Sequence, residues 1–544
     1  MKYLRWIWRN MRGIRGNMVF RVLVGIVQVC VGLSMVYACK YFIDHAIYSP
    51  YKSEVWKMAA VLVAILATNI ILNQVYYYHN IRATVVQTNK IRLRIFRLLF
   101  RRKLFLTKRI HSGDITSRLE TDVSVVSDAT TSLIPSFLIT MFQFVAAFLV
   151  MRDMDPKLAW ALIVFTPTLI IFGKFFARKL KRMTKDIREQ DSRIQALVQE
   201  GTQHNVILRS LESGEWVTGH LSDMQQDLMG KINRRSRFTI ITRSLLSSSF
   251  GLGYLLVFIW GGLQLRDGLI TFGVMTSFLQ LVSQIQHPIL SLLNMVPSFI
   301  HATASIDRLM ELEKLPVEEI HGRHIMQGPL GVKVEHVDFR YSKDERRILH
   351  DFSFDFQPGS HTAIIGRTGA GKTTFFRLLL ALIEPKKGQI ILYNNTENTP
   401  LNVDTRGNFV FVPQGNTLLS GTIRENLLLG NPDATDEELK KVLYTATAEF
   451  VFNLPKGLDT VCGERGGGLS EGQAQRIAIA RGLLRPGNIL LLDEISSSLD
   501  MKTEQVMFQR LFDAYPDKTM IFITHREKVG EMCENHIQIN REDS

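Results

Sequence analysis

The sequence predicts a helical membrane domain of six transmembrane helices with long cytosolic extensions, followed by an α/β domain with a phosphate-binding loop. Three observations lead to this fold class. Six long apolar stretches lie within the first 300 residues, strands and helices alternate after residue 330, and one strand runs through a glycine-rich loop into a helix. With 544 residues, the chain is also too long for a single core.

Each apolar stretch is long enough to cross about 30 Å of hydrocarbon as a helix. The stretches cover residues 18–42, 55–78, 133–151, 158–176, 239–263 and 272–300. Long charged segments with helical periodicity separate the second stretch from the third and the fourth from the fifth, whereas the other connections are short. An even number of spans puts both termini on the same side of the membrane.

A net charge of +14 could indicate nucleic acid, anionic lipid or acidic substrates as partners, so the positions of the basic residues matter. They cluster beside the apolar stretches. The start of the chain has six basic residues and no acidic one: Lys2, Arg5, Arg9, Arg12, Arg15 and Arg21. Further basic runs at residues 92–109 and 178–185 follow even-numbered spans. This positive-inside pattern predicts a multi-pass protein of a cytoplasmic (inner) membrane with both termini in the cytosol, and it argues against a nucleic-acid partner.

Residues 3–9 mix aromatic and apolar side chains with Arg5 and Arg9. This pattern suits a short helix in the lipid headgroup layer, and it equally suits a simple flank of the first span. The cysteines add no structural constraint. Cys30, Cys39, Cys462 and Cys533 lie far apart or in apolar segments, without the spacing of a zinc site or a disulfide framework.

A domain boundary is expected between residues 315 and 330. The segment 301–322 is polar with helical periodicity, and alternating strands begin after Pro329 and Gly331. The chain is therefore divided into a membrane domain over residues 1–315, a linker over 316–329 and an α/β domain over 330–544.

The sequence GRTGAGKTT at residues 366–374 is predicted to bind the phosphates of ATP, because it follows an apolar strand at 361–365 and opens a helix. Its backbone N–H groups can close around phosphates, Lys372 can neutralise the outer phosphates, and Thr373 can offer a hydroxyl to Mg²⁺. The residues expected to hold ATP here are Gly366, Arg367, Thr368, Gly369, Ala370, Gly371, Lys372, Thr373 and Thr374.

Two carboxylates follow the apolar strand NILLL at residues 488–492. Ligand chemistry in α/β domains takes place at such strand ends. Asp493 is therefore expected to hold Mg²⁺, and Glu494 is expected to polarise the attacking water as the catalytic base.

The segment LSEGQ at residues 469–473 lies just before QRIAIARGLL and some twenty residues ahead of Asp493. In this order the chain resembles the ATP-binding cassette (ABC) family. The resemblance implies that Ser470, Gly472 and Gln473 cap a nucleotide held by an opposing subunit, so that two ATPase domains form a head-to-tail dimer.

Further segments extend the resemblance over the α/β domain. Gln414 in FVPQG resembles the family's glutamine loop, Asp500 in SSSLD the loop after the carboxylates, and His525 in FITHRE the switch histidine. Tyr341 stands where an aromatic ring stacks on adenine. The resemblance thus implies Glu494, His525 and Gln414 as catalytic residues, Asp500 and Tyr341 as nucleotide contacts, and Thr373, Gln414 and Asp493 as Mg²⁺ ligands.

Three more segments are similar to those of ABC exporters. They are the run Gly463, Glu464, Arg465, Gly466, the segment SGDITSRLETDV at 112–123 and ASIDRLMEL at 304–312. Together they imply an exporter-type half transporter, an ATPase whose cofactors are ATP and Mg²⁺ and whose partner is a second half transporter. One position departs from the family pattern, because Glu471 replaces the usual third-position glycine. A homodimer is favoured, and a heterodimer with a degenerate partner stays open.

The sixth apolar stretch has a polar stripe on one helical face, which is costly against lipid. It consists of Gln280, Gln284, His287, Ser291, Asn294 and Ser298. The stripe is interpreted as the lining of a substrate path, and bridging between neighbouring helices is the other interpretation. The resemblance implies export of an amphipathic drug, lipid or peptide, in a bacterial membrane. An importer on the same frame and an ATP-gated channel or regulator remain alternatives.

Overall fold

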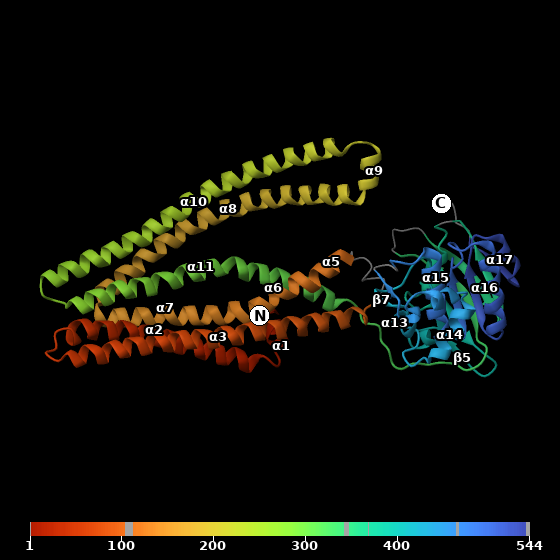
Figure 1. Ribbon diagram of the computed structural model, residues 1–544, viewed down its shortest axis with the longest axis horizontal. Helices are drawn as coiled ribbons and strands as arrows, with labels where there is room; N and C mark the ends of the chain where they lie inside the picture. Colours follow the sequence, from red (N-terminus) through yellow and green to blue (C-terminus); the bar gives the residue numbers. More distant parts are fainter. Residues whose placement is uncertain (1, 104–111, 342–346, 368, 464–466, 540–544) are drawn as a thin grey trace. The chain divides into compact units, whose positions relative to one another are not determined.

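The structure is a computed structural model that describes residues 2–103, 112–341, 347–367, 369–463 and 467–539. The chain forms two compact units (Figure 1). The first unit comprises Met1–Phe96 and Gly113–Glu313, and the second comprises Arg97–Ser112 and Lys314–Ser544. Residues 97–112, which follow the second predicted span in the sequence, therefore group with the second unit.

The regular secondary structure of the first unit is all helical among its described residues. Its helices are α1 (Lys2–Asn10), α2 (Arg15–Tyr41), α3 (Lys52–Leu99), α5 (Ser112–Ser117), α6 (Val123–Asp128), α7 (Ile134–Met154), α8 (Pro156–Gln203), α9 (Asn205–Ser210), α10 (Gly214–Arg266) and α11 (Phe272–Lys314), with π-helical turns η1 (Phe42–Ala46), η2 (Arg118–Asp122) and η3 (Ala129–Leu133). Both α3 and α11 run into unit 2 at their last residues.

Five helical segments of the described residues are long and apolar enough to cross a membrane. They are Arg15–Ala46, Lys52–Leu99, Gly113–Met154, Gly214–Arg266 and Phe272–Lys314. The predicted fourth span, residues 158–176, falls within α8, but the side chains of residues 161–178 lie outside the described part of the structure. A count of six spans therefore remains a prediction.

Helices α8 and α10 pack along each other, and α9 lies at the turn between them (Figure 1). Asp155 sets the start of α8, because its Oδ1 accepts hydrogen bonds from the backbone N–H groups of Lys157 and Leu158 at 2.9 and 3.2 Å. Pro156 follows at the first helical position, where its missing N–H costs nothing. The same carboxylate reaches α10 by accepting from Trp260 and Gln264.

The second unit contains the strands and the remaining helices. The strands are β1 (Gly331–Phe339), β2 (Leu349–Phe356), β3 (His361–Ile365), β4 (Lys387–Tyr393), β5 (Asn398–Pro400), β6 (Phe409–Val412), β7 (Gly421–Thr422), β8 (Val461–Cys462), β9 (Ile489–Asp493), β10 (Thr519–Ile523) and β11 (Asn535–Gln538). The helices are α12 (Lys372–Leu379), α13 (Ile423–Leu428), α14 (Asp436–Thr445), α15 (Glu471–Leu483), α16 (Met501–Ala514) and α17 (Glu527–Glu531), and the 3₁₀ turns are η4 (Asp404–Asn408), η5 (Glu449–Asn453) and η6 (Gly457–Asp459).

Two larger sheets form the α/β part. The antiparallel sheet has the order β2-β1-β4-β5, and the parallel sheet has the order β11-β3-β10-β9-β6. Strands β9 and β10 are buried along their whole length, as expected for a parallel sheet covered on both faces. In the register of the parallel sheet, Ile523 pairs with both Asp493 and Ile364, so the carboxyl ends of β3, β9 and β10 lie at one edge.

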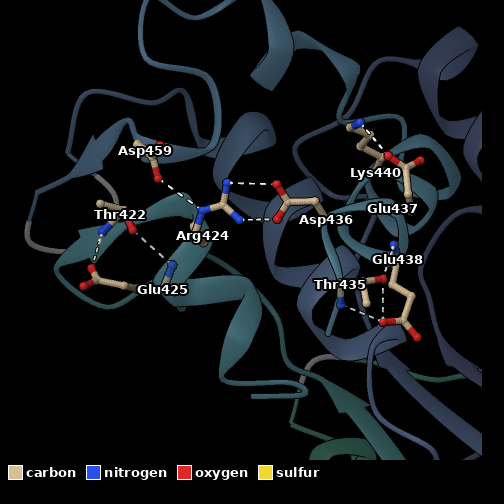
Figure 2. Close-up of polar contacts among 9 residues, drawn as sticks. All are labelled: Thr422, Arg424, Glu425, Thr435, Asp436, Glu437, Glu438, Lys440 and Asp459. Carbon is tan, nitrogen blue, oxygen red and sulfur yellow. Dashed lines mark hydrogen bonds and ion pairs between the residues drawn. The ribbon is translucent and has the colours of Figure 1, made fainter. Parts of the chain in front are cut away.

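Ion pairs and caps hold the helices that follow β6 (Figure 2). The guanidinium of Arg424 on α13 pairs with Asp436 at the start of α14 and with Asp459 in η6, the latter at 3.2 Å. The two helices begin with capping boxes, formed by Thr422 with Glu425 and by Thr435 with Glu438. One arginine thus fixes three segments of the helical part relative to each other.

The predicted linker is anchored to the second unit as an extended strap. The carboxylate of Glu318 forms a two-pronged ion pair with Arg406 at 3.0 and 3.1 Å, and Arg406 also donates to the carbonyl of Leu380. Asp404 accepts from the N–H groups of two strap residues, at 2.9 and 3.1 Å. At its beginning the strap pairs with the segment that follows α3, through the bridge between Val317 and Arg102.

Candidate functional site

The glycine-rich loop joins β3 to the amino end of α12 at the edge where the parallel strands end. Gly369 and Gly371 have φ values of 79° and 105°, which side chains rarely adopt. A Cβ at Gly371 would also come within 2.3 Å of Ile348. The loop therefore requires glycine at both positions, and it directs backbone N–H groups and the positive end of α12 to one place.

Lys372 is buried at the start of α12. Its Nζ donates to the carbonyl of Gly366 at 2.6 Å and lies 2.9 Å from Nε2 of His525. Burial lowers the pKa of Lys372 from its ordinary value, and the nearby Asp493 and Glu494 oppose that change. A phosphate group would supply the negative charge that this buried ammonium lacks.

Asp493 ends β9 and faces the loop. Its Oδ2 accepts a hydrogen bond from Thr373 at 3.3 Å. Burial raises the pKa of Asp493, and the neighbouring carboxylate of Glu494 acts in the same direction. The paired hydroxyl and carboxylate oxygens are the ligand types that Mg²⁺ prefers, so this donor set fits the expected ion.

Glu494 is held in a left-handed backbone conformation with φ of 47°. Its N–H donates to the carbonyl of Ile523 at 2.9 Å, which fixes the turn at the end of β9. Its Oε2 accepts a hydrogen bond from Gln414 at 2.7 Å, and its Oε1 lies 3.2 Å from His525 Nε2. Strained backbone of this kind is typical of functional positions. The structure thus brings Lys372, Asp493, Glu494, Gln414 and His525 into one network.

Tyr341 lies beside the same helix. Its hydroxyl is 3.1 Å from the Thr374 hydroxyl and accepts from Arg377 at 2.8 Å. The ring packs edge to face against Phe339. A tyrosine anchored in this way at the amino end of α12 is within reach of a nucleotide whose phosphates occupy the loop.

The predicted signature residues form a separate group, in which Ser470 is exposed and Gly472 and Gln473 are half-buried. Ser470 caps α15 and exchanges hydrogen bonds with Gln473 at 3.0 and 3.2 Å in a capping box. A Cβ at Gly472 would come within 2.8 Å of the Ser498 carbonyl, so glycine is needed there. Among the described residues, no hydrogen bond joins Ser470 or Gln473 to the glycine-rich loop. Asp500 likewise caps α16 by accepting from two backbone N–H groups.

Three residues of the site were not anticipated from the sequence. Gln475 on α15 is fully buried and donates to the Glu494 carbonyl at 3.2 Å, and Ser498 donates to Gln475. Arg377 orients Tyr341. In the sequence, Gln475 stands out only as a polar residue on an otherwise apolar helix face. This pattern does not tell which group Gln475 contacts.

Some predicted residues add no contact to the network. Ala370 is buried and its N–H donates to the carbonyl of Arg367 at 3.1 Å within the loop. Thr368 lies outside the described residues, as do Glu464, Arg465 and Gly466 of the exporter-like run.

The polar stripe of α11 is open on the surface of the single chain. His287, Ser291, Asn294 and Ser298 are exposed, and Gln280 and Gln284 are half-buried. Gln284 makes one long hydrogen bond of 3.4 Å to the carbonyl of Gly32. Most of this face is therefore not used to bridge helices among the described residues.

Comparisons with known proteins cover both units. The family model for the ABC transporter transmembrane region matches residues 18–289, and the ABC transporter model matches residues 349–497. YgaD of Bacillus subtilis, named as a multidrug export ATP-binding/permease protein, is 27% identical over 525 residues, with coverage of 93% of this chain and 89% of its own. A Rickettsia bellii protein, named as an export ATP-binding/permease protein, is 27% identical over 473 residues. The match covers 86% of this chain and 81% of the Rickettsia protein.

A solved structure shares the fold. The structure of a bacterial Atm1-family ABC exporter with ATP bound superposes with a TM-score of 0.82 at 20% sequence identity. The match covers 98% of this chain and 95% of the exporter chain. The order of the helical membrane unit and the α/β unit is thus the same in both.

Proposed function

Since this chain belongs to the ABC transporter family, with the fused membrane region and ATP-binding domain of an exporter-type half transporter, we propose that it hydrolyses ATP to export an amphipathic drug, lipid or peptide. The observation that carries the proposal is the network of Lys372, Asp493, Glu494, Gln414 and His525 at the end of the parallel sheet. The same chain has apolar helices able to cross a membrane, so ATP hydrolysis and transport would be coupled within one polypeptide.

Catalysis depends on positioning and charge neutralisation. Lys372 and the N–H groups of the loop bind the phosphates, and Tyr341 stacks on the base. Thr373, Asp493 and Gln414 are the residues that would hold Mg²⁺, which when bound neutralises charge on the phosphate oxygens. Glu494 takes the proton of the attacking water, and His525 orients Glu494 and contacts the terminal phosphate.

The proposed assembly is a dimer in which each signature segment caps the partner's nucleotide. Its support is the amino end of α15, where the exposed Ser470 and the positive end of the helix dipole would suit a phosphate group of a nucleotide held by the partner. A second support is the tip of the α8–α10 hairpin, which exposes Val206, Leu211 and Trp216 at 82%, 65% and 72% of their surfaces. Several large apolar side chains that are exposed close together in the sequence are typical of an interaction surface.

A second identical chain is the proposed partner. Glu471 occupies the first turn of α15, where an acidic side chain is compatible with the helix dipole, and both Ser470 and Gly472 are retained. The substitution therefore leaves the capping groups in place. A heterodimer with a degenerate half transporter is the alternative.

The cargo path is proposed to follow the open stripe of α11 that contains Gln284, His287 and Asn294. Polar groups facing lipid would be costly, so this face should border a water-filled cavity between two chains. The stripe contains no Asp, Glu, Lys or Arg, and this composition suits an amphipathic cargo.

The test uses the full chain reconstituted in vesicles with some cassettes facing outward. Added ATP and Mg²⁺ should drive an amphipathic dye into the vesicle lumen, and Glu494→Gln should abolish this accumulation. ATP-dependent depletion of dye from the lumen would indicate import, and ATP-gated current would indicate a channel. Absence of ATP hydrolysis in the folded protein would overturn the proposal.

A further inference from the structure

Helix α1 is docked firmly on the membrane unit through one face. Tyr3 and Lys2 bind Asp307 of α11 at 2.7 and 2.8 Å, and Trp6 and Arg9 bind Glu313 of the same helix at 3.1 and 2.6 Å. The Trp6 ring is 3% exposed. These contacts use the acidic groups of α11 to neutralise one set of basic residues on α1.

The carboxyl end of α1 is held by α3. Gln87 donates to the carbonyl of Asn10 at 3.2 Å, Lys90 donates to the carbonyl of Arg12, and Arg94 donates to the Asn10 side chain. Basic side chains at carbonyl groups stabilise this end of a helix. Helix α1 is therefore fixed from two sides, and its remaining face is preorganised.

That remaining face is basic and aromatic. Arg5 and Trp8 lie three residues apart on α1 and are exposed, Trp8 at 59% of its surface, and Arg12 is exposed in the turn after the helix. The guanidinium of Arg15 lies 4.2 Å from the centre of the Trp8 ring and donates to the Trp8 carbonyl. Among the described residues, no ion pair joins Arg5, Arg12 or Arg15 to a carboxylate, and the first acidic residue of the sequence is Asp44.

The helix that follows α1 in the chain exposes an apolar surface suited to lipid tails. Helix α2 begins at Arg15 and lies in a candidate membrane span. It exposes Val19, Leu23 and Val27 at 58%, 56% and 49%, at steps of four residues. Arginines and a tryptophan at the start of such an apolar surface lie at the depth of the lipid headgroups.

We propose that Arg5 and Trp8 on α1, Arg12 in the turn after it and Arg15 at the start of α2 together form a binding site for anionic phospholipid headgroups. The arginines pair with the phosphate and other anionic groups, and Trp8 lies in the interfacial layer. Because α1 is bonded to Asp307 and Glu313, the bound lipids are connected to the cytosolic end of α11. The inference requires membrane insertion but does not depend on ATP hydrolysis or on the identity of a cargo.

The test measures lipid selectivity beside Trp8. The full chain is reconstituted in vesicles that contain brominated phosphatidylcholine or brominated phosphatidylglycerol, and tryptophan quenching is compared between the native sequence and Trp8→Phe. The difference reports lipid contact at Trp8 alone. We expect Trp8 to be quenched by both lipids and to prefer phosphatidylglycerol, with the preference weakened by salt.

Arginine variants identify the cause of the preference. Each of Arg5→Gln and Arg12→Gln is expected to reduce the preference for phosphatidylglycerol about fivefold, from the typical strength of one basic residue at a charged membrane surface. A control variant, Lys441→Gln, removes the same single charge from an exposed position of the second unit and should leave the preference unchanged.

Two outcomes would overturn the inference. If neither lipid quenches Trp8, the face is covered by protein and not by a bilayer. If both arginine variants keep the full preference in protein that remains folded, anionic lipid is not recognised by this face. Arg5 and Arg12 make no side-chain hydrogen bond within the described residues, so neither variant is expected to prevent folding.

Discussion

Glu494 combines a strained backbone with two hydrogen-bonding neighbours. The φ of 47° directs its carboxylate toward Gln414 and His525, while Asp493 turns to Thr373. In the proposed mechanism, Asp493 therefore serves the metal and the adjacent Glu494 serves the attacking water. This division explains why the two carboxylates are not interchangeable.

The first prediction concerns the Glu494→Gln substitution. The amide keeps the size of the side chain and can still bond to Gln414, but it cannot accept a proton from water. Nucleotide affinity should be close to native, and the maximal ATPase rate should fall by about a factor of 10² to 10⁴. Equilibrium ATP binding and steady-state hydrolysis are the measurements. Native turnover in this variant would remove Glu494 from the catalytic role.

The second prediction concerns pH and Asp155. Burial alone would raise the pKa of Asp155, but hydrogen bonds from Trp260, Gln264 and two backbone N–H groups outweigh burial and lower it. A lowered pKa in the folded state means that the carboxylate stabilises the fold above its ordinary pKa. This stabilisation is lost as the pH falls through the lowered value.

Asp155→Asn should therefore lower the melting temperature at neutral pH. The difference in melting temperature between the variant and the native protein should vanish below about pH 4. The melting temperature in nanodiscs, measured from pH 7 downward, gives this comparison. A gap that is constant with pH would contradict the assigned cause.

At the scale of elements, the strap at the start of the second unit is held by more long-range hydrogen bonds and ion pairs than its sequence indicates. Its polar composition predicts a linker, but its path depends on Arg406, Asp404 and Asn408, which lie about 80 residues away in the chain. No local pattern encodes such long-range pairs. The strands at 361–365 and 489–493, by contrast, follow from their apolar runs and flanking turns.

The third prediction is that Arg406→Ala frees the strap. The change leaves the buried Glu318 carboxylate without its partner, at a cost of about 3 kcal/mol in the unfolding free energy. We also expect faster tryptic cleavage near Arg323. The control is Lys103→Ala, which removes the exposed ion pair with Glu384 and should cost less than about 1 kcal/mol.

Equal stability of the two variants, together with equal cleavage rates, would show that Arg406 does not hold the strap. A difference confined to cleavage would locate the effect in the strap and not in the folded core. Thermal unfolding and limited proteolysis of the same preparations separate these results.

The same contrast applies to the site. The lysine, the two carboxylates, the glutamine and the histidine were predicted because each stands in a short segment of recognisable order. Gln475 was not predicted, because its role depends on a buried contact between α15 and the turn at Glu494. The roles of Ser470 and Asp500 cannot be read from one chain, in which both side chains serve as helix caps.

At the scale of the whole molecule, several surfaces are incomplete in a single chain. The signature end of α15, the tip of the α8–α10 hairpin and the stripe of α11 all expose groups that would be expected to have partners. In a dimer closed by two nucleotides, each of these three surfaces would have a partner surface on the second chain or a bound ligand. Binding energy of ATP at two shared sites would then favour one arrangement of the membrane helices over another.

The central claim is that ATP and Mg²⁺ bring two cassettes together and thereby rearrange the membrane helices. The most direct measurement is the distance between spin labels at Lys441→Cys, in the Glu494→Gln protein lacking Cys30 and Cys39, reconstituted in nanodiscs. The account predicts that ATP with Mg²⁺ shifts the label distances to a narrow, shorter distribution, and that nucleotide removal reverses the shift. Distances that stay the same while ATP is bound to folded protein would contradict it.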